Sequence, residues 1–67
     1  MKISAAESLV MEMLWRQSPL SAEDIAAALG PEQSWSDKTV KTLLNRLLTK
    51  KAVAAVRDGR RYLYSPL

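Results

Sequence analysis

The stretch WSDKTVKTLLNRLLTKK, residues 35–51, decides the fold. Its apolar residues follow the spacing of a helix that packs one stripe against a core: Val40, Leu43, Leu44, Leu47 and Leu48. Ser36 precedes this stripe at the place where a helix needs an N-cap. We therefore predict a helix that begins after Ser36 and turns its other side away from the core.

The opposite face of this predicted helix is polar and cationic. At about 100° per residue, its members turn away from the leucine stripe: Lys38, Thr39, Lys41, Thr42, Asn45, Arg46 and Thr49. None of them is a carboxylate, whereas a face selected only for solubility mixes both signs of charge. This composition favours a negatively charged partner, and a merely solvated surface is the alternative.

A first helix is predicted near the N-terminus, where Ser4 and Glu7 have the spacing of a capping box. Its apolar face is expected to contain Leu9, Val10, Met13 and Leu14, with Trp15 beside them. Pro19 separates this helix from the next one because proline lacks an amide donor. Leu20 is expected in a short extended segment.

A second helix is predicted after Ser21, which repeats the serine cap and is followed by acidic residues in the first turn. Its inward residues are expected to be Ile25, Ala28 and Leu29. Gly30 should end the helix in the left-handed conformation, because Pro31 cannot continue it.

After residue 51 the periodicity changes from helical to alternating. VAAV (53–56) and RYLYS (61–65) are predicted strands, and the Asp-Gly pair between them is a strong hairpin signal that Pro66 should end. Leu20 could add a third strand. The prediction is a mainly α domain with a small antiparallel β-hairpin (α+β), a winged helix-turn-helix in which three helices precede one wing.

The aromatic side chains are interpreted mainly as packing residues: Trp15, Trp35, Tyr62 and Tyr64. Each tryptophan adjoins an apolar helix stripe or a cap, so anchoring in the core is expected, with ligand stacking as the alternative. The two tyrosines share one face of their strand, from which a hydroxyl group could still reach a phosphate.

Charge is distributed unevenly around a net charge of +3. Residues 1–37, including Lys2, carry a net charge of −4, whereas residues 38–67 carry +7. A basic half points first to nucleic acid, with a solvated basic surface as the alternative. Arg57, Arg60 and Arg61 surround the predicted turn, where they could contact phosphates or a minor groove, or could simply make the hairpin tip soluble.

The composition excludes several functional classes. A chain of 67 residues supports one domain, and without cysteine or histidine it offers neither disulfides nor the common soft-metal sites, so no cofactor is expected. No stretch is long and apolar enough for a membrane span, and the start MKISAAES lacks a secretion signal, so a cytoplasmic protein is expected. The carboxylates are expected in helix caps, away from the basic face, which argues against an enzyme.

Four stretches together resemble the penicillinase-repressor family (the BlaI, MecI and CopY group): AESLVMEMLW, SPLSAEDIAAAL, WSDKTVKTLLNRLLTKKAV and GRRYLYSP. The resemblance covers nearly the whole chain. It implies a dimeric bacterial repressor that binds dyad-symmetric, double-stranded operator DNA. Residues 36–51 would then be the recognition helix in the major groove, and residues 57–61 would be the wing on the backbone or in the minor groove.

Carried over by position, the resemblance assigns Ser36, Lys38, Thr39, Thr42 and Arg46 to the recognition helix and Arg60 and Arg61 to the wing. The outer helix face adds Lys41 and Asn45, which completes the set of candidate DNA-binding residues. A winged-helix protein-interaction module is the alternative, and it would need an exposed apolar patch.

The resemblance has two departures from the family pattern. The family's C-terminal helical dimerisation region has no counterpart in these residues, so the chain alone is expected to be a monomer and the homodimer to need that region. Ala52 stands where the family usually has glycine. A left-handed residue is expected at this position, so Ala52→Gly should stabilise the fold by about 0.5 to 1 kcal/mol.

Overall fold

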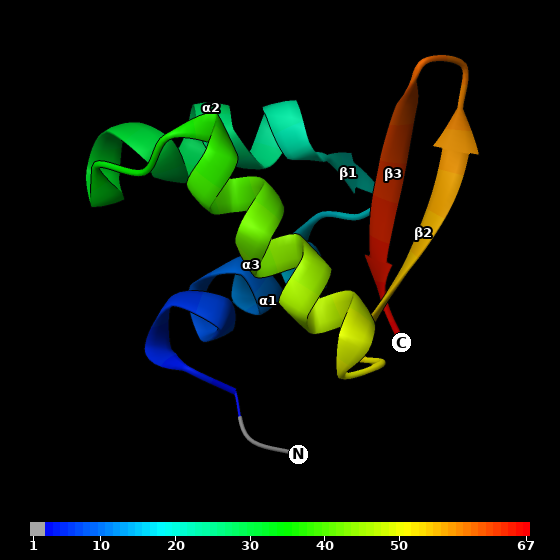
Figure 1. Cartoon of the computed structure of the whole chain (residues 1–67), viewed down its shortest axis with the longest axis horizontal. Coiled ribbons are helices and arrows are strands. Elements are labelled where there is room, and N and C mark those ends of the chain that lie inside the picture. The colour runs from blue at the N-terminus through cyan, green and yellow to red at the C-terminus, as the bar shows by residue number, and fades with distance from the viewer. Residues whose placement is uncertain (1–2) are drawn as a thin grey trace.

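The computed structural model describes residues 3–67, so Lys2 lies outside the described residues. The elements in chain order are α1 (Ala5–Arg16), β1 (Leu20–Ser21), α2 (Ala22–Gln33), α3 (Asp37–Thr49), β2 (Val53–Asp58) and β3 (Arg61–Pro66). In Figure 1, α3 crosses in front of α1 while the β2–β3 hairpin projects at one side. The predicted three helices and wing are confirmed, and the fold is a winged helix.

The wing is a regular hairpin within an antiparallel sheet of order β1-β3-β2. Asp58 pairs with Arg61, which leaves Gly59 and Arg60 as the turn. Gly59 has a φ of 64°, as the Asp-Gly signal predicts, because a tight hairpin turn of this kind requires positive φ. The third strand is also present, since Leu20 pairs with Tyr64 at the base of the wing.

The serine caps lie where the sequence predicts them. Ser4 and Glu7 form a reciprocal capping box at α1, and Ser21 and Asp24 form another at α2. At α3 the Oγ of Ser36 accepts the amide hydrogen of Thr39 at 3.2 Å. Each helix therefore begins where a side chain satisfies an amide that the helix itself leaves unpaired.

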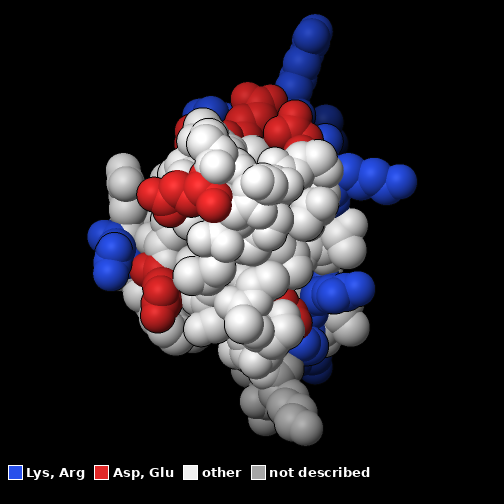
Figure 2. Space-filling view, turned by 90° about the vertical axis from the view of Figure 1, so that its left-hand side faces the viewer, with Lys and Arg blue, Asp and Glu red and all other residues white. Residues whose placement is uncertain are grey.

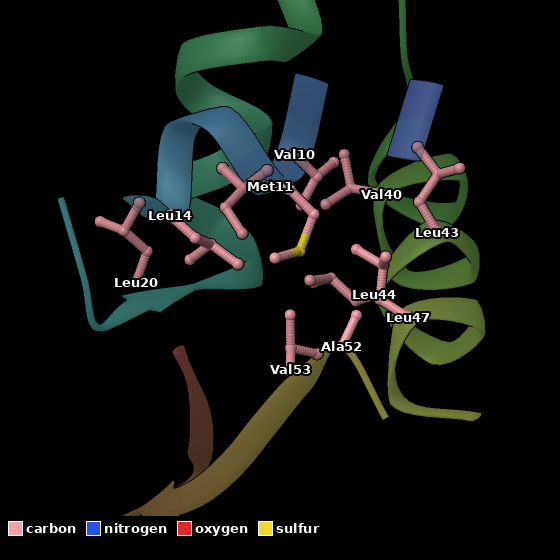
Figure 3. Packing of buried hydrophobic residues seen from close by; sticks show 11 residues of the cluster. Val10, Met11, Leu14, Leu20, Val40, Leu43, Leu44, Leu47, Ala52 and Val53 are labelled. Carbon is pink, nitrogen blue, oxygen red and sulfur yellow. The ribbon is translucent and has the colours of Figure 1, made fainter. Parts of the chain in front are cut away.

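One hydrophobic core joins the helices to the base of the wing (Figure 3). Its buried members are Val10, Met11, Leu14, Leu20, Ile25, Val40, Leu43, Leu44, Leu47, Ala52 and Val53. The predicted α3 stripe is buried except for Leu48, which is partly buried. This stripe fixes which face of α3 remains outside.

The buried face of α1 differs from the predicted one. Its fully buried residues are Glu7, Val10, Met11 and Leu14, whereas Leu9 and Met13 are only partly buried. The apolar pattern misled the prediction because a carboxylate occupies one position of the buried face. Trp15 is 63% exposed, so the expectation that it anchors the core is wrong, while Trp35 packs against the core as expected.

The end of α2 corrects another prediction. The helix continues through Gly30 and Pro31, and the left-handed residue is Ser34, with a φ of 59°. Proline removes only its own amide donor, and the amides of Ser34 and Trp35 close the helix by donating to the carbonyl of Gly30. Gly30 instead permits close packing, since a Cβ there would lie 3.2 Å from the Trp35 carbonyl oxygen. Ala28, expected inside, is exposed.

The turn after α3 places the left-handed residue one position earlier than predicted. Lys51, not Ala52, has a φ of 60°. The amide of Lys51 donates to the carbonyl of Leu48, and the amide of Ala52 donates to that of Leu47, which is the Schellman pattern. Ala52 does not have a positive φ and is buried in the core, so the expectation of strain at Ala52 is wrong.

We expect Lys51→Gly to raise the free energy of unfolding by about 0.5 to 1 kcal/mol, because glycine removes the Cβ penalty at positive φ. Ala52→Gly should lower it by a similar amount, about 0.5 to 1 kcal/mol, since it loosens an ordinary backbone and removes a buried methyl group. Urea melts measure both changes. Lys51→Ala is the control for the loss of charge, and a larger gain from Ala52→Gly than from Lys51→Gly would contradict the assignment.

Candidate nucleic-acid interface

The outer face of α3 carries the predicted polar residues to the surface. Its exposed members are Lys38, Lys41, Thr42, Asn45, Arg46 and Thr49. Thr39 is half-buried, and its hydroxyl lies 3.2 Å from that of Ser36, so both residues also serve the N-cap. The side chains of the other α3 candidates are exposed to solvent.

Two threonine hydroxyls on this face are bonded to their own helix. Thr42 donates from Oγ1 to the carbonyl of Lys38 at 2.9 Å, and Thr49 donates to the carbonyl of Asn45 at 3.0 Å. The cationic side chains therefore supply most of the outward donors of α3, together with the amide of Asn45.

The wing tip presents three exposed arginines in different surroundings. Arg57 donates from Nε to the carbonyl of Gly59 at 3.1 Å, and Arg61 lies 3.5 Å from a carboxylate oxygen of Asp58. Within residues 3–67, Arg60 has neither a side-chain hydrogen bond nor an ion pair. Arg60 is thus the wing cation most available to a partner.

A hollow of about 290 Å³ lies between α3, the start of α2 and the wing. Its lining residues are Ser21, Ala22, Glu23, Lys41, Asn45, Arg60, Arg61, Tyr62 and Tyr64. The structure thus brings two α3 candidates together with two wing candidates. The presence of Glu23 corrects the expectation that the carboxylates lie away from the basic face.

The other α3 candidates gather on a second part of the helix surface. One shallow hollow is lined by Lys38, Thr39, Thr42, Leu43 and Arg46. A neighbouring one is lined by Thr42, Asn45, Arg46, Thr49 and Lys50. Thr42 and Arg46 border both hollows, and at about 100° per residue Thr42 lies near the middle of the exposed face with Arg46 towards one edge.

The two tyrosines of β3 differ in burial. Tyr64 packs against the core, and this burial raises the pKa of its hydroxyl, with the nearby Tyr62 adding to the effect. Tyr62 is 50% exposed, pairs with Arg57 towards the wing tip and lines the hollow beside α3. The packing interpretation therefore holds for Tyr64 and is wrong for Tyr62.

A partly buried ion pair at the end of α3 was not predicted from the sequence. Nζ of Lys50 lies 2.7 and 2.8 Å from the two carboxylate oxygens of Glu7, which is 2% exposed. The hydrogen bond from Lys50 lowers the pKa of Glu7, burial opposes it, and Ser4 lowers the pKa further. The sequence signal was the place of Glu7 in a buried i, i+3, i+4, i+7 pattern with Val10, Met11 and Leu14.

Charge is segregated on the folded surface as well as along the chain. The face shown in Figure 2 is mainly uncharged and acidic, and most of the visible lysines and arginines project from its right-hand edge. That edge is the side that faces the viewer in Figure 1, where α3 lies in front of α1. In this view the lysines and arginines therefore lie mainly towards the side that carries α3.

The family model for the penicillinase repressor matches residues 3–67. The chain belongs to the penicillinase repressor family. The penicillinase repressor of Bacillus licheniformis is 35% identical over 65 residues, which cover 97% of this chain and 51% of that protein. The methicillin resistance regulatory protein MecI of Staphylococcus aureus is 33% identical over 66 residues, 98% of this chain and 54% of that protein. This family member thus spans about half the length of those curated relatives.

Solved structures of the repressor BlaI have the same fold as this family member. The solution structure of the BlaI DNA-binding domain is 35% identical, with a TM-score of 0.89 over 97% of this chain and 79% of that one. The monomeric form of Bacillus licheniformis BlaI, solved in complex with the blaP half-operator, is 35% identical. Its TM-score is 0.83, over 98% of this chain and 80% of that one. No helix within residues 3–67 is long and apolar enough to span a membrane.

Proposed function

We propose that this chain is the DNA-binding domain of a bacterial transcriptional repressor that recognises double-stranded operator DNA by sequence. The observation that carries the proposal is the exposed α3 face, which is cationic and polar and lies beside a basic wing. Its relative BlaI was solved with a half-operator, which supports this assignment. In such a fold the second helix of the helix-turn-helix enters the major groove, where each base pair presents its own pattern of donors and acceptors.

The proposed interface divides into two groups of residues. Lys41, Asn45, Arg60 and Arg61 line the hollow between α3 and the wing, which suits a phosphate group of one DNA strand. The residues assigned to base edges or to the start of the recognition helix are Ser36, Lys38, Thr39, Thr42 and Arg46. Lys and Arg can donate to guanine acceptors in the major groove, while the phosphate contacts position the helix.

The assembly on DNA follows from the size of this reading unit. A single module of this kind buries roughly 600 to 1,000 Å², which gives limited specificity. We therefore propose a dyad-symmetric operator occupied by two copies, with the described residues monomeric by themselves. A repressor of this kind acts in the cytoplasm, where bacterial DNA lies, and its function is binding and not catalysis.

We expect the logarithm of the DNA-binding constant to fall with the logarithm of salt concentration with a slope of roughly −3 to −5, for about four to six phosphate contacts. Arg60→Gln should weaken binding to all sequences alike and make the slope shallower by about 1, because it removes one phosphate contact. Fluorescence anisotropy over a salt series measures both quantities.

Arg16→Gln is the matched control, since it removes the same charge from an exposed position on α1. This variant should keep the slope of the unmodified chain. A slope near zero for the unmodified chain would overturn the DNA proposal and favour a protein-interaction role. Equal effects of the two substitutions would mean that only net charge matters and that the wing makes no contact.

A further inference from the structure

Thr42 lies at the centre of the exposed α3 face, but its hydroxyl hydrogen is already used. Oγ1 donates to the carbonyl of Lys38 at 2.9 Å, and a threonine has only one such hydrogen. Donating it to a base would require breaking a bond within the helix. Without rearrangement this exposed side chain can no longer donate outward, and it offers only its Cγ2 methyl group and the acceptor lone pairs of Oγ1.

The exposed side chains around Thr42 are polar, so its methyl group is an apolar contact point surrounded by hydrogen-bond donors. Thr42 borders both shallow hollows of the α3 face, which it shares with Arg46, while Lys38 and Asn45 each line one of them. Those three neighbours carry the outward donors of this region. A methyl group surrounded by hydrogen-bond donors is complementary to a base pair that presents an apolar group beside hydrogen-bond acceptors.

Thymine has this chemistry, because it alone among the four bases places a methyl group in the major groove, next to an acceptor oxygen. We propose that Thr42 selects for a thymine by van der Waals contact between its Cγ2 methyl and the thymine C5-methyl group. This inference rests on the proposed DNA-binding function and adds the base class that one residue recognises. The Thr42 hydroxyl then serves to orient the methyl group.

The test uses the tightest duplex recovered by selection from a random double-stranded DNA pool. Each thymine is replaced in turn by deoxyuridine, which lacks only the C5-methyl group. We expect one replacement to weaken binding about fourfold, the effect of one methyl group leaving an apolar contact. Thr42→Val keeps an outward methyl and should retain this penalty, whereas Thr42→Ser keeps the hydroxyl, lacks the methyl and should show no penalty at that thymine.

Thr49→Ser is the matched control, because Thr49 makes the same hydrogen bond at the last residue of α3. It should leave the deoxyuridine penalty unchanged, and thermal melts should show all three variants folded. The inference is overturned if no thymine is sensitive, if Thr42→Ser keeps the penalty, or if Thr42→Val abolishes it. It also fails if Thr49→Ser removes the penalty. In each case salt-dependent binding to the duplex would remain, so the proposed function would stand separately.

Discussion

Fusing a dimerising coiled coil after Leu67 is expected to tighten binding to a palindromic duplex by about 10² to 10⁴. The reason is that the second reading unit then binds at a high effective concentration once the first is bound. The geometry suits the fusion, because the C-terminus lies at the end of the sheet remote from the wing tip (Figure 1). Leu67 is 78% exposed, and its amide is held by the carbonyl of Ala52.

The measurement compares a duplex that carries two inverted copies of the selected half-site with a duplex that carries one. The fusion should bind only the two-copy duplex more tightly than the unfused chain does. A fusion whose coiled coil is disrupted by proline should show no increase in affinity. Analytical ultracentrifugation should find the unfused residues monomeric at micromolar concentration. A tight dimer of the unfused chain, or equal affinity with and without the coiled coil, would contradict the proposed role of pairing.

Lys50→Met is expected to lower the free energy of unfolding by about 2 to 3 kcal/mol, because it leaves the carboxylate of Glu7 buried without its partner. Lys50 is 32% exposed, so water can replace part of the lost interaction and the effect falls below that of a fully buried pair. Urea melts at neutral pH measure the loss. Glu7→Gln combined with Lys50→Met should recover most of it, since no buried charge then remains.

The same ion pair predicts how stability responds to pH. The pKa of Glu7 is lowered from 4.5, so its contribution to stability is full above that value and is lost as the pH falls through the lower folded-state pKa. In Lys50→Met the largest cause that lowers the pKa of Glu7 is removed, so this pKa should lie above its value in the unmodified chain and acid should destabilise the variant less. The measurement is the free energy of unfolding at a series of pH values. If it changes with pH in the same way in both proteins, the ion pair with Lys50 does not set the pKa of Glu7 in the folded state.

Local signals account for what the sequence predicts well. Ser36 and the leucine stripe define α3 within one stretch of chain, and the Asp58-Gly59 pair defines the wing in the same way. Because the stripe fixes the buried side of α3, it also predicts most of the candidate interface.

The features that the sequence did not predict depend mainly on contacts between residues far apart in the chain. The Glu7–Lys50 pair joins residues 43 positions apart, and no local pattern reports it. Glu23 joins the basic hollow only because β3 brings the wing against the start of α2. The left-handed residue after α3 was misplaced by one position because the cap depends on which carbonyls the last amides reach.

Ser21 belongs to two parts of the fold at once. It caps α2, and it pairs with Leu63 in the sheet, so the base of the wing is bonded to the start of the helix-turn-helix. Because α2 also packs on α3, the wing and α3 are held as one preorganised body, and little orientational freedom is left to lose when both meet a duplex. A duplex whose grooves do not match this fixed distance between wing and helix must deform to bind. Its deformation energy then weakens binding, so affinity depends on the shape of the DNA.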